Sequence, residues 1–258
     1  MRLRFLGTGT SHGVPVVGCS CAVCTSTDPR DSRYRCSAIV EGDGGEVVLI
    51  DAGPEFRVQA LRARLSRLDA ILVTHAHADH IHGLDDVRPL TRGKPLPVYA
   101  SAPDIREIRA RFAYAFMDSQ AGGGKPRLEL TEIAPDGVTI GSIKAIAVPL
   151  LHGTRRVFGY RIGGLAYLTD CSAIPESSME LLGDLDLLVI DALRLRSHPT
   201  HFSVDEAFRI ALRLKPSALL LTHICHDLSH AQLEDHCARA DLPFPTNPAW
   251  DGLEIDLP

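Results

Sequence analysis

Histidine and aspartate are concentrated in one short segment of the chain. Four of the twelve histidines lie within eight residues, directly after an apolar run at residues 70–73, in the segment Thr74-His75-Ala76-His77-Ala78-Asp79-His80-Ile81-His82-Gly83. Side chains alternate in extended backbone, so His75 and His77 point to the same side and can bind one metal ion. A turn into a helix near Asp79 would present Asp79 and His80 to a second ion. Imidazole and carboxylate donors without a thiolate favour a catalytic site over a purely structural one.

The opposing interpretation of this segment is a loop of solvated histidines with Asp79 as a helix cap. For a single histidine that interpretation is the better one, but this concentration of ligand-type side chains favours a metal site. His82 is the member that fits best as a capping or packing residue at the helix start.

Further ligand-type residues follow apolar strands downstream. His152 follows a run that ends at Leu151, Asp170 follows residues 166–169, and His223 follows residues 219–222. A rigid sheet holds a strand-end residue in place while leaving it accessible. One aspartate can bind two cations through its two oxygens, so Asp170 is the expected bridging ligand. Each of the three, taken singly, fits a cap or a loop residue equally well.

A second cluster is built from thiols. Cys19, Cys21 and Cys24 form a Cys-x-Cys-x-x-Cys pattern in a loop that contains glycine and serine. Three soft ligands at this spacing predict a closed structural zinc site that needs a fourth donor. The pattern alone leaves Cys36 and Cys225 as candidates for that donor, although Cys36 fits better as a buried thiol at the start of a strand. The alternative for the three cysteines is a loop of reactive or buried thiols.

Composition excludes several classes of protein. The chain has 258 residues, of which 45% are hydrophobic and 23% charged, which is typical of a globular protein with a sizeable core. Its 27 basic and 32 acidic residues give a net charge of -5, so no global positive field attracts nucleic acid or an acidic membrane, and an anionic substrate must be captured locally. No apolar run approaches the roughly 20 residues that cross a bilayer. The strand-like start without a signal sequence and the odd number of cysteines indicate the cytoplasm.

The elements that must position these residues follow from the hydrophobic pattern. Short apolar runs predict strands at residues 3–6, 37–40, 47–50, 70–73, 98–100, 143–148, 166–168, 187–190 and 218–221. Helices are predicted at residues 56–65, 104–116 and 204–214, the last opened by a capping box at Ser203 and Glu206. A surface loop is expected at residues 122–126 and hairpin turns at Asp136-Gly137 and Gly163-Gly164. We expect one domain over residues 1–258, with a zinc-binding loop at about residues 18–36.

The chemistry-bearing residues together resemble the metallo-β-lactamase superfamily. The pattern His75-x-His77-x-Asp79-His80 followed by His152, Asp170 and His223 is similar to its five-histidine, two-aspartate dinuclear motif, and residues 49–53 are similar to its first motif. The resemblance implies an α/β (α+β) protein, a four-layer αββα sandwich. It assigns His75, His77 and His152 to one metal, Asp79, His80 and His223 to the other, and Asp170 to both. It makes Asp51 a residue that positions a ligand or a loop.

Within the superfamily the chain resembles the phosphoribosyl cyclic phosphate phosphodiesterase, or PhnP-like, branch. The shared features are Gly7-Thr8-Gly9-Thr10, Val14-Pro15, the cysteine pattern after Gly18, Phe158-Gly159-Tyr160, Leu221-Thr222-His223-Ile224-x-His226 and Asp251-Gly252-x-Glu254-Ile255. This resemblance supplies His226 as the fourth ligand of the structural zinc. It also matches His201 to a histidine over the phosphate, for leaving-group protonation or phosphate contact; the alternative is a neighbour of the helix start.

The predicted function is hydrolysis of a small anionic phosphodiester, a phosphoribosyl cyclic phosphate being the leading candidate. Two divalent metals about 3.5 to 4 Å apart would share a hydroxide that attacks phosphorus. Manganese and zinc, and also iron, are compatible with the donors, and one structural zinc is expected in addition. Asp79 and His201 are the candidate catalytic residues. Arg155 and Arg156 either hold a phosphate or ribose or are solvated loop charges, and the resemblance implies a homodimer.

Four other functions are weighed against this one. A tRNase Z-like RNA phosphodiesterase needs a flexible basic arm, for which the loop from Gly122 to Arg127 is too short. A relative of the pyrroloquinoline quinone type carries the cysteine motif but departs from the full dinuclear ligand set. A lactam or thioester hydrolase of the same fold is compatible with the residues. A metal sensor or store is disfavoured because mixed ligands of this kind leave positions open.

Overall fold

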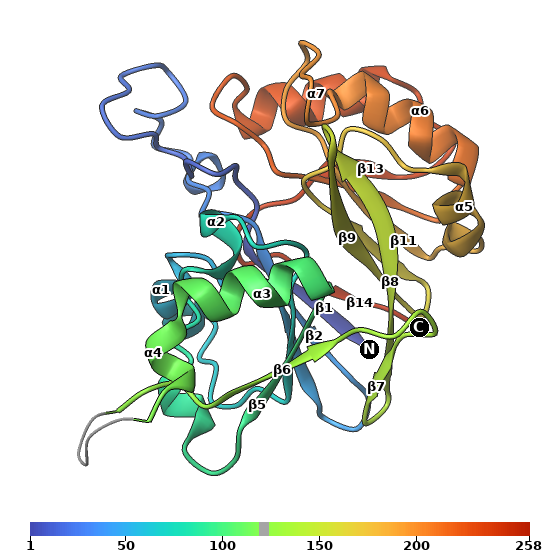
Figure 1. The fold of residues 1–258 in the computed structure, drawn as a ribbon. Coiled ribbons are helices and arrows are strands. Elements are labelled where there is room, and N and C mark those ends of the chain that lie inside the picture. Colours follow the sequence, from blue (N-terminus) through green and yellow to red (C-terminus); the bar gives the residue numbers. More distant parts are fainter. Residues whose placement is uncertain (119–123) are drawn as a thin grey trace.

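A computed structural model describes residues 1–118 and 124–258 and contains two seven-stranded sheets (Figure 1). The first has the order β14-β1-β2-β3-β4-β5-β6, with bounds Glu254–Asp256, Arg2–Gly7, Ser37–Glu41, Val47–Ile50, Ala70–Leu72, Leu96–Ala100 and Leu128–Glu132. The second has the order β13-β12-β11-β10-β9-β8-β7, with bounds Thr246–Pro248, Leu219–Thr222, Leu187–Asp191, Leu165–Leu168, Arg155–Ile162, Ile143–His152 and Val138–Ile140.

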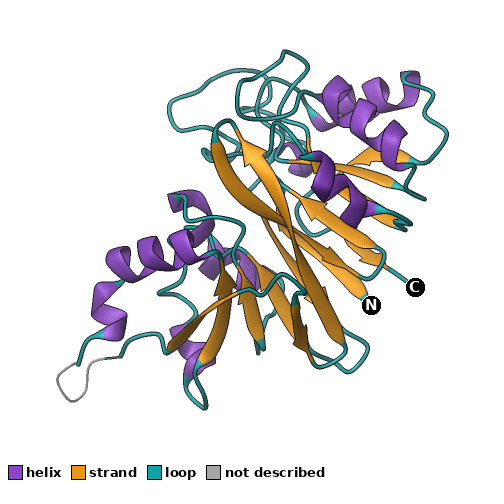
Figure 2. Cartoon of the chain, turned by 45° about the vertical axis from the view of Figure 1, so that its right-hand side comes forward, coloured by secondary structure: helices purple, strands orange, loops and turns teal. Residues whose placement is uncertain are grey.

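Helices cover the outer face of each sheet, which gives the four-layer αββα sandwich (Figure 2). On the first sheet these are α1 (Phe56–Arg62), α2 (Ala78–Ile81), α3 (Ala102–Arg111) and α4 (Ala113–Phe116). On the second they are α5 (Glu176–Met179), α6 (Val204–Leu214) and α7 (His230–Arg239). Short 3-10 turns lie at Pro29–Asp31 (η1), Arg88–Thr91 (η2) and Glu180–Leu182 (η3). The predicted fold class is confirmed.

Central strands are apolar on both faces because each face packs against a different layer. In β3, Val48 and Ile50 point into the core between the sheets, whereas Leu49 points to the helices of the first sheet. In β11, Val189 points into the same central core and Ile190 points to the helices of the second sheet. Side chains alternate along a strand, so an unbroken apolar run is what a middle layer requires.

The predicted elements are found, with corrections at their ends and in one turn. All nine predicted strands are present, and the capping box of Ser203 and Glu206 opens α6. The helix expected at residues 104–116 is divided at Phe112 into α3 and α4. Gly163-Gly164 joins the antiparallel strands β9 and β10, as a hairpin turn should.

Asp136-Gly137 is not a hairpin turn. It connects β6, at the edge of the first sheet, with β7, at the edge of the second. A turn dipeptide between two strands predicts a change of direction, but it carries no information about which sheet the next strand joins. In the loop expected at residues 122–126, residues 122 and 123 lie outside the described part of the chain. Within residues 1–118 and 124–258, we find no helix that combines the length and the apolar character needed to cross a membrane.

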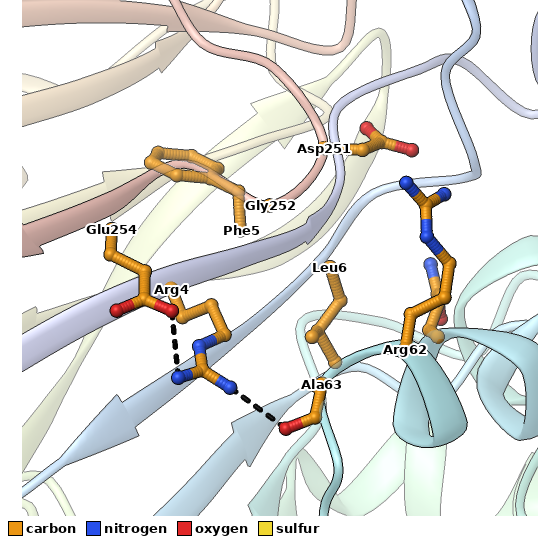
Figure 3. Close-up of a pocket in the computed structure, with 9 residues that line it drawn as sticks. Arg4, Phe5, Leu6, Arg62, Ala63, Asp251, Gly252 and Glu254 are labelled. Carbon is orange, nitrogen blue, oxygen red and sulfur yellow. Dashed lines mark hydrogen bonds and ion pairs between the residues drawn. The ribbon is translucent and has the colours of Figure 1, made fainter. Parts of the chain in front are cut away.

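The half-buried carboxylate of Asp251 joins the start of the chain to its end. Asp251 accepts hydrogen bonds from Thr8 N at 2.9 Å, Thr8 Oγ1 at 2.8 Å and Tyr34 N at 2.7 Å. It lies beside a small pocket of about 190 Å³, and the Arg62 guanidinium points toward it (Figure 3). Burial raises the pKa of Asp251 from 3.8 to about 6, against the lowering effect of these hydrogen bonds.

This raised pKa makes stability depend on pH. Between pH 4 and 6 the folded state retains the proton that the unfolded state has lost, so the free energy of unfolding falls as pH rises through this window, by about 3 kcal/mol for two pKa units. Asn cannot titrate, so Asp251→Asn should remove this part of the pH dependence. Denaturant unfolding of both proteins at several pH values measures it. A free-energy difference between the two proteins that is constant from pH 4 to pH 7 would contradict the assignment.

Candidate metal centre

The histidine and aspartate side chains meet at one edge of the sandwich. His75 and His77 follow β4, His80 lies on α2, and His152 ends β8. The parallel strands β10, β11 and β12 end beside one another, so the residues that follow them meet at the same edge. Asp170 follows β10 and His223 follows β12.

The backbone is strained at this edge. Asp51, Asp170 and His223 have φ values of 60°, 51° and 59°, in the left-handed region that residues other than glycine rarely adopt. Such conformations cost about 1–3 kcal/mol each and cluster at functional sites. The sharp turns after the strands direct these side chains into the centre.

Three imidazoles form the first group of donors. The Nε2 atom of His75 lies 2.8 Å from the Nδ1 atom of His77. The ring of His152 lies 5.7 Å from that of His75 and 5.4 Å from that of His77, and one ring nitrogen of each of the three falls within 4.8 Å of the others. His152 Nδ1 donates to the carbonyl oxygen of Thr200 at 2.8 Å. That bond leaves its Nε2 atom available as a ligand.

Asp170 lies between the donors of the second group. Its Oδ2 atom is 3.2 Å from His80 Nε2 and 3.2 Å from His223 Nε2. Asp79 Oδ2 lies 3.3 Å from the same His80 nitrogen. Because His75 is also close to His80 and Asp170, the two groups are adjacent and share the Asp170 carboxylate.

Asp51 orients His80. Its Oδ2 atom accepts a hydrogen bond from His80 Nδ1 at 2.7 Å, and the carboxylate also accepts from the backbone nitrogen and the hydroxyl of Thr74 at 2.8 Å each. This carboxylate–imidazole pair fixes which nitrogen of His80 faces Asp170. Partners of this kind are typical of histidines that bind metals.

Electrostatics keep the Asp170 carboxylate ionised. Burial raises the pKa of Asp170, but His223 and His80 outweigh burial and hold it well below its usual range. Burial lowers the pKa of His80, but Asp170, Asp51 and Asp79 outweigh burial and raise it well above the ordinary value. In the same way Asp170 and Asp191 raise the pKa of His223 to about 9. Buried carboxylates at this density therefore require positive charge close by.

The donor set fits divalent cations. Within the described chain, His223 Nε2 faces Asp170 Oδ2 at 3.2 Å without the geometry of a hydrogen bond, and neither His223 Nδ1 nor Asp191 Oδ1 has a hydrogen-bond partner. Buried polar atoms without partners are rare and call for an explanation. Imidazole nitrogens and carboxylate oxygens converging on two adjacent points supply one, because these are the ligands of zinc, manganese and iron.

His201 lies over this centre, and sequence reasoning missed the residue that holds it. Its ring stacks on His223 with a centroid distance of 4.5 Å, and its Nδ1 atom donates to Asp191 Oδ2 at 2.8 Å. Asp191 ends β11, is fully buried and also accepts from Cys171 N at 2.9 Å. The strand-end position that singled out Asp170 applies equally to Asp191 and could have identified it.

The two arginines weighed as phosphate contacts or as solvated loop charges differ in their surroundings. Arg155 Nη2 donates to Asp104 Oδ1 at 2.7 Å and to Glu107 Oε1 at 2.9 Å. Asp104 Oδ1 also accepts from Ala76 N at 3.0 Å, so Arg155 orients the loop between His75 and His77 rather than offering a free guanidinium. Arg156 is exposed. The proximity of both arginines to His152 in the sequence carried no information about the carboxylates of α3.

His82 has no place in either donor group. It is exposed at the end of α2, and its ring lies 6.1 Å from Phe112. This is the packing role allowed for it by the sequence.

A separate cluster brings the three half-buried cysteines to His226. The Nδ1 atom of His226 lies 3.3, 3.5 and 3.4 Å from the sulfurs of Cys19, Cys21 and Cys24. Tetrahedral zinc with Zn–S near 2.3 Å and Zn–N near 2.05 Å separates sulfur from nitrogen by about 3.5 Å. A hydrogen bond from Cys24 N lowers the pKa of Cys21 to about 6, which favours the thiolate needed for metal binding.

The other two candidate cysteines lie elsewhere. Cys36 is buried directly before β2, with its sulfur 3.5 Å from Thr222 Oγ1. Cys225 accepts a hydrogen bond from Asp227 N at 3.3 Å. Among the cysteines and histidines of the described chain, the group around the Cys-x-Cys-x-x-Cys loop is completed by His226 alone.

A buried arginine links this cluster to the sandwich. Arg33 donates to the carbonyl oxygens of Cys225 at 3.2 Å and Leu228 at 3.3 Å, and it pairs with Asp31 at 3.3 Å. These contacts hold the turn that carries His226. Since His223 lies three residues before His226, the same turn joins the two clusters.

The chain is similar in sequence to a known protein family over the segments that carry the metal-ligand candidates. The family described as "Beta-lactamase superfamily domain" matches residues 46–224, a span that runs from β3 through the histidine segment to the turn after β12. The chain belongs to the metallo-β-lactamase superfamily. The matched span contains every residue of the two histidine and aspartate donor groups.

Three known proteins are similar to this chain in sequence or in structure. A solved diphosphatase from the PhnP family is 44% identical, with a TM-score of 0.90 over 100% of this chain and 98% of that one. An octanoyltransferase of Porphyromonas gingivalis is 39% identical over 98% of this chain and 51% of its own length, so the chain spans about half of that protein. A coenzyme PQQ synthesis protein B of Methylorubrum extorquens is 25% identical over 74% of this chain and 72% of its own.

Proposed function

We propose that this protein is a phosphodiesterase-type hydrolase of the PhnP-like branch, acting on a small anionic phosphate compound. The observation that carries the proposal is the Asp170 carboxylate between His80 and His223, directly beside the three imidazoles of His75, His77 and His152. Two adjacent donor groups that share one carboxylate are suited to a pair of divalent cations.

The proposed ligands follow from the two groups. One cation is held by the three imidazoles of the first group and the other by Asp79, His80 and His223, with Asp170 shared between them. The donors are compatible with manganese or zinc, and also with iron. A structural zinc is held by the three sulfurs of residues 19, 21 and 24 together with His226.

Cations bound here would neutralise an anionic substrate and lower the pKa of a water molecule toward neutrality. The protein supplies proton transfer on the leaving-group side. Asp191 holds the Nδ1–H of His201, so the Nε2 atom is the one that serves the substrate. The Asp191 contact holds the ring in place, with Nε2 as the atom that passes a proton to a departing oxygen.

The preferred substrate is a phosphoribosyl cyclic phosphate, and a diphosphate is the second candidate. The diphosphate is favoured by the likeness to the PhnP-family diphosphatase over the whole chain. Both reactions are attacks on phosphorus and differ in the leaving group. A sugar hydroxyl is a poorer leaving group than phosphate, so it depends more on protonation by His201.

A substrate panel tests the proposal. The protein, reconstituted separately with manganese and with zinc, is incubated with bis(p-nitrophenyl) phosphate, a phosphoribosyl cyclic phosphate, ADP, a pre-tRNA, a lactam and an octanoyl thioester. We expect turnover of the first three classes of compound or a subset of them. Turnover limited to the lactam, to the thioester or to pre-tRNA would overturn the proposal.

Removal of the His201 imidazole should affect substrates unequally. We expect His201→Ala to lower kcat about 100-fold for the cyclic ribose phosphate, whose leaving group needs a proton, but only a few-fold for bis(p-nitrophenyl) phosphate. Metal content should be unchanged. The matched control is His236→Ala, which removes an imidazole on α7 that pairs with Asp205. Loss of metal in the His201 variant would show instead that this residue is a ligand or scaffold residue.

A further inference from the structure

A pocket of about 360 Å³ extends from the metal centre toward the cysteine cluster. His201 and His223 of the metal centre line it, and so does His226 of the cysteine cluster. The lining also includes Arg194 and His198, from the loop after β11, neither of which has a role in the proposed chemistry.

His198, which lines this pocket, carries a hydrogen-bond donor at a fixed ring position. Its Nδ1 atom accepts from the backbone nitrogen of Thr200 at 3.3 Å and lies 3.1 Å from the Thr200 hydroxyl. A backbone N–H can only donate, so the proton of the neutral ring is on Nε2. The ring lies 5.2 Å from that of His201, so the donor is next to the histidine that serves the reacting phosphate.

Arg194 adds a cation whose donors are largely unused. Its Nε atom makes one long hydrogen bond of 3.4 Å to the carbonyl oxygen of Arg196, and its Nη1 atom lies 3.9 Å from Asp227. Asp227, the acidic residue on the pocket wall, is held more closely by Arg196, at 2.8 Å. The Arg194 fork is therefore available to an anion in a chain whose net charge is -5.

We propose that Arg194 and His198 form a second anion subsite, which holds a non-reacting phosphate of a substrate that carries two phosphates. This rests on the proposed function, because the first phosphate is the one that reacts beside His201. The two phosphates are either joined in a diphosphate or separated by a ribose. The donors of Arg194 and His198 match the oxygens of this second phosphate.

The test uses matched ligands that differ by one phosphate. Isothermal titration of the metal-loaded protein compares the α,β-methylene analogue of ADP with AMP. Steady-state kinetics compare phosphoribosyl cyclic phosphate with ribosyl cyclic phosphate. The variants are Arg194→Ala and His198→Ala. The control is Arg213→Ala, an arginine of α6 that pairs with Glu176 on the outside of the second sheet.

In the unmodified protein the ligand with the second phosphate should bind more tightly in at least one pair. Each of the two variants should raise the Kd or KM of that ligand about tenfold, because loss of a hydrogen bond to a charged group has this effect. The Kd or KM of the ligand that lacks the second phosphate should change by no more than about twofold. The control should change neither. The pair that shows the effect identifies the spacing of the two phosphates.

Two results would overturn the subsite. The first is that the unmodified protein binds both ligands of each pair with equal affinity. The second is that the variants lose as much affinity for the ligand without the second phosphate as for the ligand that carries it. Failure of the proposed function looks different. In that case no phosphate compound is turned over, while the binding advantage of the second phosphate persists and depends on Arg194.

Discussion

Replacing Asp170 with asparagine should abolish turnover and lower the content of active-site metal. The carboxylate lies 3.2 Å from both His80 Nε2 and His223 Nε2 and is almost fully buried, so an amide would leave the centre without its shared negative charge. We expect kcat to fall at least about a thousandfold, as it does when a group that stabilises charge in an active site is removed. Elemental analysis after dialysis should find two active-site metal equivalents in the unmodified protein and less than one in the variant.

The chain offers a close control for this substitution. Asp184 also has a φ of 51°, the same value as Asp170, but its side chain is exposed. Asparagine tolerates left-handed backbone, so neither Asp170→Asn nor Asp184→Asn strains the turn. Asp184→Asn should retain activity and metal. An Asp170 variant that keeps two metals and more than a tenth of the activity would contradict the shared-carboxylate assignment.

The sequence predicted most of the central strands because burial on both faces leaves a strong signal. It missed the interior strand β9, whose sequence Arg155-Arg156-Val157-Phe158-Gly159-Tyr160-Arg161-Ile162 interrupts the apolar run with three arginines. It also did not predict β6, β7, β13 or β14, which are short strands at sheet edges. In β6 the pattern Leu128-Glu129-Leu130-Thr131-Glu132 is mostly exposed, so it lacks the apolar run of a central strand. An edge strand is defined by the neighbour that it pairs with, and that neighbour is distant in the sequence.

In the candidate site, too, local sequence patterns predicted some residues, whereas contacts between distant segments were not predicted. Residues at strand ends could be predicted as a set, because parallel strands bring their ends to one edge. The partners of Arg155 were not predicted, since Asp104 and Glu107 lie about 50 residues away on another layer. His226 was supplied by family resemblance rather than by spacing, because a contact across 207 residues leaves no local pattern in one sequence.

Loss of one thiolate from the cysteine cluster should release the structural zinc and destabilise the protein. Cys24 Sγ lies 3.4 Å from His226 Nδ1 and accepts a hydrogen bond from Val16 N at 3.3 Å, so Cys24→Ala removes both a ligand and an anchor of the loop. We expect one zinc equivalent to be lost and the thermal midpoint to fall by roughly 10 °C or more, because zinc binding contributes directly to folding.

Cys24→Ala should also lower the catalytic efficiency of the active site. Val16 and His226 line the pocket that leads to His223, so release of the loop removes part of the wall around the substrate. The expected result is a kcat/KM about tenfold lower, with the two active-site metals retained. The control, Cys225→Ala, changes a neighbouring thiol that lies outside the cluster and should leave zinc content unchanged. Loss of zinc from the Cys225 variant, together with its retention in His226→Ala, would show that the fourth ligand is the thiol of residue 225 and would separate the structural metal from the pocket wall.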